Sequence, residues 1–126
     1  VGKNSAGQIA KLANQIIVGI TIGSVAEAIK FSQKNNVNPI NILNALKGGW
    51  ADSKVLQTHG LRMIKNDFKP RGKNFSQLKD MNNILDCAKN KKLELPLSKI
   101  VKKMYYKLVK KGLGNYDHSS LYKSYK

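Results

Sequence analysis

The sequence predicts an all-helical fold, a helical bundle around a long buried first helix. Apolar residues recur at helical spacing in five or six segments, and glycine and proline separate these segments. No segment shows the strict alternation of a convincing strand. The length of 126 residues suits one domain with a modest core.

The first predicted helix spans residues 6–34, with Asn4 or Ser5 as its N-cap. Its middle, IIVGITIGSVA, is apolar on nearly every side, so we expect protein to surround it. This apolar run is too short to span a bilayer, and polar or charged side chains flank it. Gly19 and Gly23, four residues apart, would let another helix approach closely.

The second helix has Asn38 as its N-cap and Pro39 at its first position, and the glycines at 48–49 end it. The third helix is expected over residues 52–66. Its core candidates are Val55, Leu56, Leu61, Met63 and Ile64.

Pro70 and Gly72 interrupt the periodicity, which predicts a loop over FKPRGKNF before a fourth helix at 76–92. Pro96 opens a fifth helix, which Gly112 ends. Its apolar stripe consists of Ile100, Val101, Met104, Tyr105 and Leu108. GLGNYDHSS is predicted to form a turn, and a short helix is expected to close the chain.

The net charge of +16 raises the question of nucleic-acid binding. Only Arg62 and Arg71 are arginines, and arginine does most direct base reading. A general bias towards lysine, asparagine and isoleucine accounts better for the charge. The alternative function is a basic helical module that binds nucleic acid or another polyanion. Its binding stripe would contain Lys89, Lys91, Lys92, Lys99, Lys102, Lys103, Lys107, Lys110 and Lys111.

The single cysteine, Cys87, cannot form an internal disulfide, which indicates a reducing compartment. Its helical context predicts a small buried hydrophobic residue. No secretory signal pattern opens the sequence. We expect a cytoplasmic protein, or a mitochondrial one in a eukaryote, that does not associate with membranes.

Five segments occur in an order and at a spacing typical of one enzyme family. They are VGKNSAGQIAKLANQIIVGITIGSVAEAI, AEAIKFSQKNNVNP, GGWADSKVLQTHGLRMI, LKDMNNILDCAKNKKLELPL and GLGNYDHSSL. In them the chain resembles the C-terminal domain of the β-hydroxyacid dehydrogenases, which include 3-hydroxyisobutyrate dehydrogenase and tartronate semialdehyde (2-hydroxy-3-oxopropionate) reductase. The resemblance covers essentially the whole chain, and it implies the helical fold of 6-phosphogluconate dehydrogenase-like enzymes.

The resemblance also implies a two-domain enzyme that moves hydride between NAD or NADP and a small hydroxyacid or semialdehyde. In this family a Rossmann domain binds the nucleotide, and the helical domain supplies a catalytic lysine and most dimer contacts. The chain contains no G-x-G-x-x-G that follows a strand. We therefore expect a domain fragment, a proteolytic remnant or a separate subunit, inactive without its own Rossmann domain and dimeric through the first helix.

Lys11 aligns with the catalytic lysine of the family, which implies a role as general acid or base. Carbonyl reduction builds negative charge on oxygen, and a nearby cation or proton donor stabilises it. An ordinary lysine is a poor base near neutral pH, so this role requires a sheltered side chain. Asn14 and Gln15 share the helix face of Lys11. By resemblance these amides bind the substrate; the alternative is that they satisfy backbone groups.

Gly2 and Gly7 match a glycine-containing first loop of the family, where the backbone passes close to substrate and cofactor; ordinary loop glycines are the alternative. By resemblance Lys79 reaches the cofactor or the substrate. Asp80 is expected to stabilise its helix N-terminus or to pair with a neighbouring base. Trp50 occupies an aromatic position of the family and either walls the substrate pocket or simply packs.

Arg71 stands where many relatives have glycine, and an exposed loop is favoured over contact with an acidic substrate. Asp117 and His118 match a C-terminal DHS pattern, and His59 is the only other histidine. A metal site needs several converging ligands, so we infer none from the sequence. For His118 we expect a structural hydrogen bond.

Overall fold

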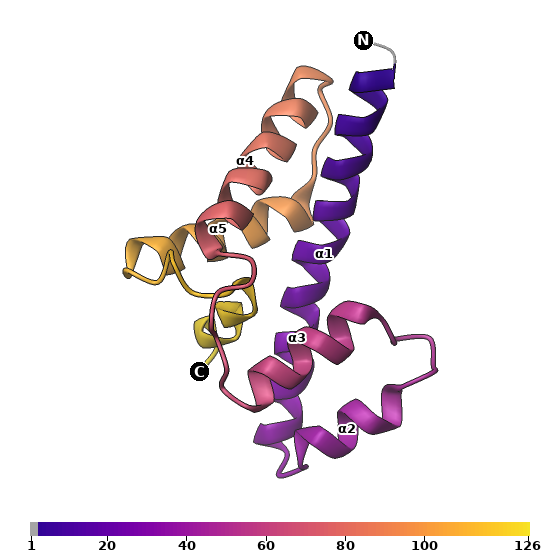
Figure 1. Ribbon diagram of the computed structural model, residues 1–126, viewed down its shortest axis with the longest axis vertical. Helices are drawn as coiled ribbons and strands as arrows, with labels where there is room; N and C mark the ends of the chain where they lie inside the picture. Colours follow the sequence, from indigo (N-terminus) through magenta and orange to yellow (C-terminus); the bar gives the residue numbers. More distant parts are fainter. Residues whose placement is uncertain (1–2) are drawn as a thin grey trace.

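The computed structural model describes residues 3–126, and within this range it is a helical bundle (Figure 1). The predicted all-helical class is confirmed, since the described residues contain no strand beyond an isolated bridge between Lys73 and Asp117. The elements are α1 (Lys3–Lys34), α2 (Pro39–Leu46), α3 (Lys54–Ile64), α4 (Asn74–Asn90), α5 (Pro96–Lys110) and the 3₁₀ helix η1 (His118–Ser124).

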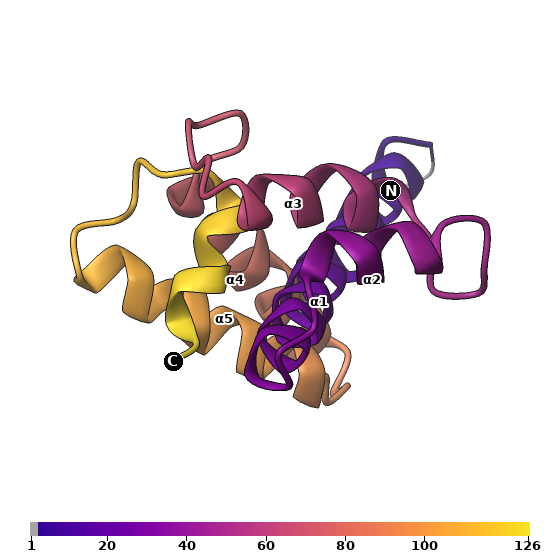
Figure 2. The ribbon, with the colours of Figure 1, turned by 90° about the horizontal axis from the view of Figure 1, so that it is seen from below.

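α1 runs the length of the molecule and contacts every other element. Viewed nearly along α1, α2 and α5 lie on opposite sides of it (Figure 2). One face of its C-terminal half enters the core through Ile22, Val25, Ala26 and Ile29. The helix is central, as expected. Protein surrounds only part of it, however, because no element within residues 3–126 covers its opposite face, where Ile17 and Phe31 are exposed.

The start of α1 differs from the sequence prediction. The helix begins at Lys3, so Asn4 and Ser5 lie inside it and do not cap it. No proline or turn residue with left-handed backbone stands in this stretch, and continued helix satisfies the backbone N–H and C=O groups. By length and composition alone α1 could cross a membrane, contrary to the sequence analysis; in the structure it contacts all the other elements.

Helices α2 and α5 begin at the prolines that were predicted to open them, whereas α3 and α4 each begin two residues away from the prediction. Asn38 caps α2 by accepting from the Ile40 N–H, and Pro39 takes the first helical position. Helix α4 begins at Asn74, two residues before the prediction. The backbone N–H groups of Asn74 and Phe75 donate to carbonyls of residues 114–116, so contacts distant in sequence set this helix start.

Gly19 lies at a close contact of α1 with α4 and α5, as its small size predicted. A Cβ at this position would lie 2.9 Å from Gln77 Nε2 and 3.3 Å from the Met81 sulfur. A Cβ at Gly23 would meet only Leu121, at 3.9 Å. Gly19 therefore permits the packing of α4 on α1, and Gly23 has a looser contact.

The predicted core sets are confirmed in part. Leu56 and Met63 of α3 are buried, and Val55, Leu61 and Ile64 pack partly buried against the core. On α5 the stripe is buried at Val101, Tyr105 and Leu108. Ile100 of the same stripe is 58% exposed, because none of the described elements covers this side of α5.

We predict that Gly19→Leu lowers the free energy of unfolding by about 1–3 kcal/mol, since the added side chain meets a packed interface. The matched control is Gly7→Leu, also in α1, where an added Cβ would meet nothing within 4 Å. This control should be neutral, or stabilise by up to about 1 kcal/mol, because leucine favours helix over glycine. Urea unfolding followed by circular dichroism measures both; equal losses would contradict the packing role.

Candidate functional site

The lysine–amide face of α1, defined as Lys11, Asn14 and Gln15, is tied to α4 by a side-chain hydrogen bond. Gln15 Nε2 donates to Asp80 Oδ2 at 2.8 Å. Asn14 Nδ2 in turn donates to Gln15 Oε1 at 3.2 Å. A carboxylate only accepts, so it fixes which end of the Gln15 amide faces α4. These two successive hydrogen bonds, from Asn14 to Gln15 and from Gln15 to Asp80, therefore orient both amides.

Asp80 thus has a different role from the two expected. It lies inside α4, away from the helix N-terminus, and its hydrogen-bond partner is an amide. Within residues 3–126 the Asn14 side chain makes only this hydrogen bond, which leaves its Oδ1 and one N–H available to another group. Asn14 is exposed, whereas Gln15 is half-buried.

Lys11 and Lys79 are both exposed, and neither has an ion-pair partner within residues 3–126. The shelter that the sequence analysis expected for Lys11 is therefore not supplied by this chain. The Gln15–Asp80 hydrogen bond joins the helix that carries Lys11 to the residue beside Lys79. The Lys79 side chain itself is exposed on α4.

The remaining predicted site residues are placed differently from the prediction. Gly7 is part of α1 and not of a loop, and Gly2 lies outside the described residues. Trp50 is fully exposed in the α2–α3 connection, so in this chain it neither packs nor walls a pocket. That connection lies far along α1 from its N-terminus (Figure 1), so Trp50 and Lys11 are not brought together.

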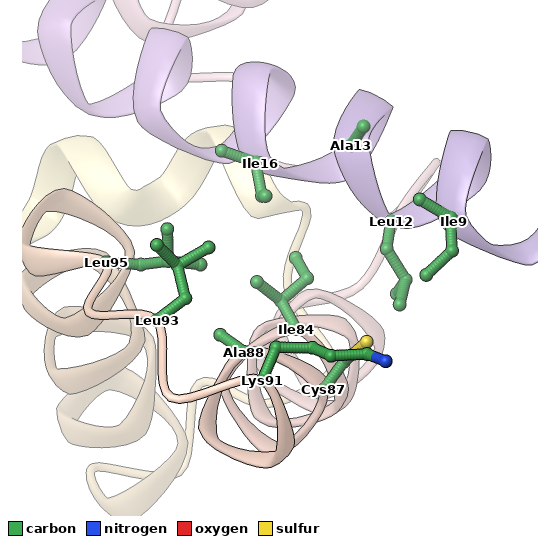
Figure 3. Close-up of a pocket in the computed structure, with 10 residues that line it drawn as sticks. All are labelled: Ile9, Leu12, Ala13, Ile16, Ile84, Cys87, Ala88, Lys91, Leu93 and Leu95. Carbon is green, nitrogen blue, oxygen red and sulfur yellow. The ribbon is translucent and has the colours of Figure 1, made fainter.

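An apolar groove of about 180 Å³ lies between α1, α4 and the α4–α5 connection (Figure 3). Cys87 lines it and is only half-buried, which corrects the prediction of a buried residue. Helical spacing places the lysine–amide face on the other side of α1. The groove is thus separate from the predicted site. The other lining residues are Ile9, Leu12, Ala13, Ile16, Ile84, Ala88, Lys91, Leu93 and Leu95.

A polar cluster, missed by the sequence analysis, surrounds the buried carboxylate of Asp117. Its Oδ1 accepts from the backbone N–H groups of Arg71 and Gly72 at 3.0 and 3.1 Å. Its Oδ2 accepts from the Ser119 N–H and hydroxyl, and from Arg62 at 3.3 Å. Burial acts to raise the pKa of Asp117, but these hydrogen bonds outweigh burial and lower that pKa to about 2.

The two histidines of the sequence meet beside this carboxylate. His59 Nε2 lies 2.8 Å from His118 Nε2, and His118 Nδ1 lies 3.3 Å from Gln77 Oε1. The hydrogen-bonding role predicted for His118 is confirmed. Burial lowers the pKa of His59 to about 4, and the charges of His118 and Arg62 add to that shift while Asp117 opposes it. Burial also lowers the pKa of His118.

The basic residues form no enclosed site in the described chain. Of the lysines in the proposed polyanion stripe, Lys102 is half-buried and the others are exposed. Lys99 pairs with Glu94 at 3.2 Å. Arg71 pairs with Asp67 at 2.8 Å on an exposed loop, in line with the loop interpretation.

Comparisons with known proteins point to one family. Residues 5–125 match the family described as NAD-binding of NADP-dependent 3-hydroxyisobutyrate dehydrogenase. The 2-hydroxy-3-oxopropionate reductase of Escherichia coli (strain K12) is 40% identical over 121 residues, which cover 96% of this chain and 41% of that protein. The chain thus spans well under half the length of this curated relative.

Solved structures show the same fold. A 3-hydroxyisobutyrate dehydrogenase from Salmonella typhimurium superposes with a TM-score of 0.90 at 22% identity, over 95% of this chain and 42% of that one. The Mycobacterium tuberculosis 3-hydroxyisobutyrate dehydrogenase with L-serine gives a TM-score of 0.87 at 21% identity, over 94% of this chain and 43% of that one. In both, the part that matches is helical like this chain.

We predict that stability falls as the pH is lowered from about 7 to about 5, by about 1–2 kcal/mol. The folded-state pKa of His59, about 4, lies below the ordinary value of 6.5, so the unfolded chain binds a proton that the folded chain does not. His118 acts in the same direction, against the opposing charge of Asp117.

Urea unfolding at the two pH values, in a buffer with a chelator, measures this loss. The control is the double variant His59→Gln and His118→Gln, whose stability should be nearly flat between the two pH values. A slope as steep as that of the unaltered chain would show that other groups carry the pH dependence.

Proposed function

The chain belongs to the 3-hydroxyisobutyrate dehydrogenase family, and on that premise we propose that it is the helical domain of an NAD(P)-dependent β-hydroxyacid dehydrogenase. Its substrate would be a small hydroxyacid or semialdehyde, the chemical class named for the E. coli relative. The observation that carries the proposal is the oriented lysine–amide face of α1, held to α4 by the Gln15–Asp80 hydrogen bond. The activity requires a nucleotide-binding domain of the Rossmann type as partner.

Asn14 and Gln15 would bind the substrate. Asp80 holds the Gln15 amide, and Gln15 holds one N–H of Asn14. The free Oδ1 and N–H of Asn14 can accept from a hydroxyl and donate to a carboxylate of the same small molecule. Because both amides are held in advance, little side-chain freedom is lost when substrate binds.

Lys11 would act as the general acid or base, one helical turn from Asn14. In reduction its ammonium stabilises the charge that develops on the carbonyl oxygen and donates the proton; in oxidation the neutral amine accepts the hydroxyl proton. The side chain is solvated in this chain. A partner domain that closes over the lysine–amide face would exclude water and strengthen each of these interactions.

Lys79 fits a role in holding the cofactor. Its ammonium is exposed on α4 and has no ion-pair partner in the described part of the chain, so it is available to a phosphate oxygen. When bound, the nicotinamide cofactor would supply or accept the hydride. Gly7, beside the lysine–amide face, leaves open space where a substrate or cofactor can approach the helix.

A second copy of the chain is the proposed partner for the exposed apolar stripe of α1. Ile17 and Phe31 on this helix are 67% and 73% exposed. Leu97 and Ile100 of α5 are also exposed and line a groove against α1. A large contiguous apolar surface on a soluble domain marks an interaction site. We therefore propose a homodimer built on α1, as the family resemblance implies.

Lys11→Ala is expected to lower kcat of the two-domain enzyme by about 10²- to 10⁴-fold, since it removes the proton donor and acceptor. The fold should not change, because the side chain is exposed and unpaired in the described residues. Steady-state assays of nicotinamide absorbance measure the change, and Lys34→Ala, also exposed on α1, is the matched control. Equal kcat values for the two variants would remove Lys11 from the mechanism.

Ile17→Glu should weaken self-association by at least tenfold, or about 1.4 kcal/mol, because it places a charge in an apolar contact. Gln8→Glu adds the same charge at another exposed position of α1 and should leave association unchanged. Sedimentation equilibrium of the chain gives both dissociation constants. A monomeric unaltered chain, or a dimer that Ile17→Glu leaves intact, would refute the α1 interface.

A further inference from the structure

The two imidazole rings of the chain face one another through their Nε2 atoms, 2.8 Å apart. Their centroids are 4.7 Å apart and their planes are inclined by 59°. His59 comes from α3 and His118 from the start of η1, so tertiary packing brings them together. Both rings are half-buried, so solvent reaches them. The lysine–amide face takes no part in this arrangement.

Each ring is also held from its far side. His118 Nδ1 faces the side-chain carbonyl Oε1 of Gln77 at 3.3 Å, which suits an N–H at Nδ1. The backbone carbonyl of Val55, one turn earlier on α3, lies near the His59 ring. Nδ1 of His59 is nevertheless buried and has no hydrogen-bond partner among the described residues. If His118 keeps its proton on Nδ1, its Nε2 is an acceptor, and His59 must donate from Nε2. The Nδ1 of His59 is then left without a donor.

A metal ion between the two Nε2 atoms resolves this conflict. Both rings could then carry their proton on Nδ1, with Gln77 and Val55 as the carbonyl acceptors. Histidine ligands usually show this pattern, in which the metal-binding nitrogen is opposite an N–H that donates to an oxygen. The ring orientations in the structure therefore match what metal binding requires, and the only change is that the His59 proton moves from Nε2 to Nδ1, so no net proton is released.

The nitrogen separation selects the kind of ion. Two metal–nitrogen bonds of about 2.1 Å at a right angle place the nitrogens about 3 Å apart, and a tetrahedral angle places them about 3.4 Å apart. The observed 2.8 Å is closer to the right angle. Square-planar or tetragonal coordination by nitrogen and oxygen is typical of Cu²⁺ and Ni²⁺.

Nearby groups pack against the rings and set the local charge balance. A Cβ at Gly72 would lie 3.1 Å from His118 Nε2, so glycine is the residue that fits against this edge of the ring. The ligand atoms of His59, His118 and Asp117 lie within 4.8 Å of one another. The Asp117 oxygens already accept hydrogen bonds from Arg71, Gly72, Ser119 and Arg62. The negative charge of Asp117 would therefore offset part of the charge of the metal ion, although the cation of Arg62 cancels some of it. Water would complete the coordination.

We propose that His59 and His118 form a two-histidine site for a divalent transition-metal ion of tetragonal geometry, with Cu²⁺ as the best fit. The bound ion would join α3 to η1 and so fasten the C-terminal segment to the bundle. This site is independent of the dehydrogenase proposal, because none of its residues belongs to the lysine–amide face.

The test uses the tag-free chain with Cys87→Ser, since a thiol also binds copper. At one Cu²⁺ per chain, electron paramagnetic resonance should show tetragonal copper with hyperfine splitting from two imidazole nitrogens. Calorimetry should show that His118→Ala weakens Cu²⁺ binding at least tenfold, and that Gln77→Leu weakens it about 10- to 100-fold through loss of ring orientation. Asp86→Asn, which removes an exposed carboxylate of α4, should have no effect.

Two results would overturn the proposal. The first is a Cu²⁺ spectrum without two nitrogen ligands, which needs no histidine variant and so decides the matter even if His118→Ala does not fold. The second is equal Cu²⁺ affinity in the chain with and without both histidines. Either result would leave the rings as a hydrogen-bonded pair only, with the Gln77 amide turned to donate to His118.

Discussion

The buried carboxylate of Asp117 is the interaction on which the C-terminal half of the structure depends. Its oxygens collect donors from α3, from the α3–α4 loop and from the start of η1. Hydrogen bonds to a charged group contribute about 1.5–3 kcal/mol each, and unpaired donors would be costly once buried. By joining these three segments, Asp117 positions its neighbour His118 next to His59 and Gln77. The His118 carbonyl in turn accepts from the buried Tyr105 hydroxyl at 2.8 Å.

α1 contacts the elements of this cluster and also carries the candidate site, because its different faces carry different kinds of residue. One face enters the core and admits α4 at Gly19. Another carries the lysine and the amides, and a third carries the exposed stripe that includes Ile17 and Phe31. A helix that is apolar on nearly every side needs neighbours on every side to bury it, and the other described elements leave Ile17 and Phe31 exposed.

Local signals in the sequence predicted most of the fold. The cap at Asn38, the proline at 39 and the glycine at 19 each act within a few residues or at one packing contact, so their effects could be predicted. The bonds that shape the two sites join residues 65 and 59 positions apart, and no local pattern reports such pairs. The helix face shared by Lys11 and Gln15 and the DHS pattern at His118 pointed to these residues, but neither signal named the partner Asp80 or His59. The exposure of Lys11 could not be foreseen either, because it depends on what covers the helix.

The contrast between the held amides and the solvated lysine has a physical rationale. Gln15 and Asp80 meet within this chain, so their geometry is set before any partner or substrate arrives. The Lys11 ammonium keeps its hydration, since a charge buried without a partner costs far more than a hydrogen-bonded amide does. Such a domain can fold without burying an unpaired charge. It would then acquire a low-dielectric site only when a second domain excludes the water, and each charge interaction would strengthen at that moment.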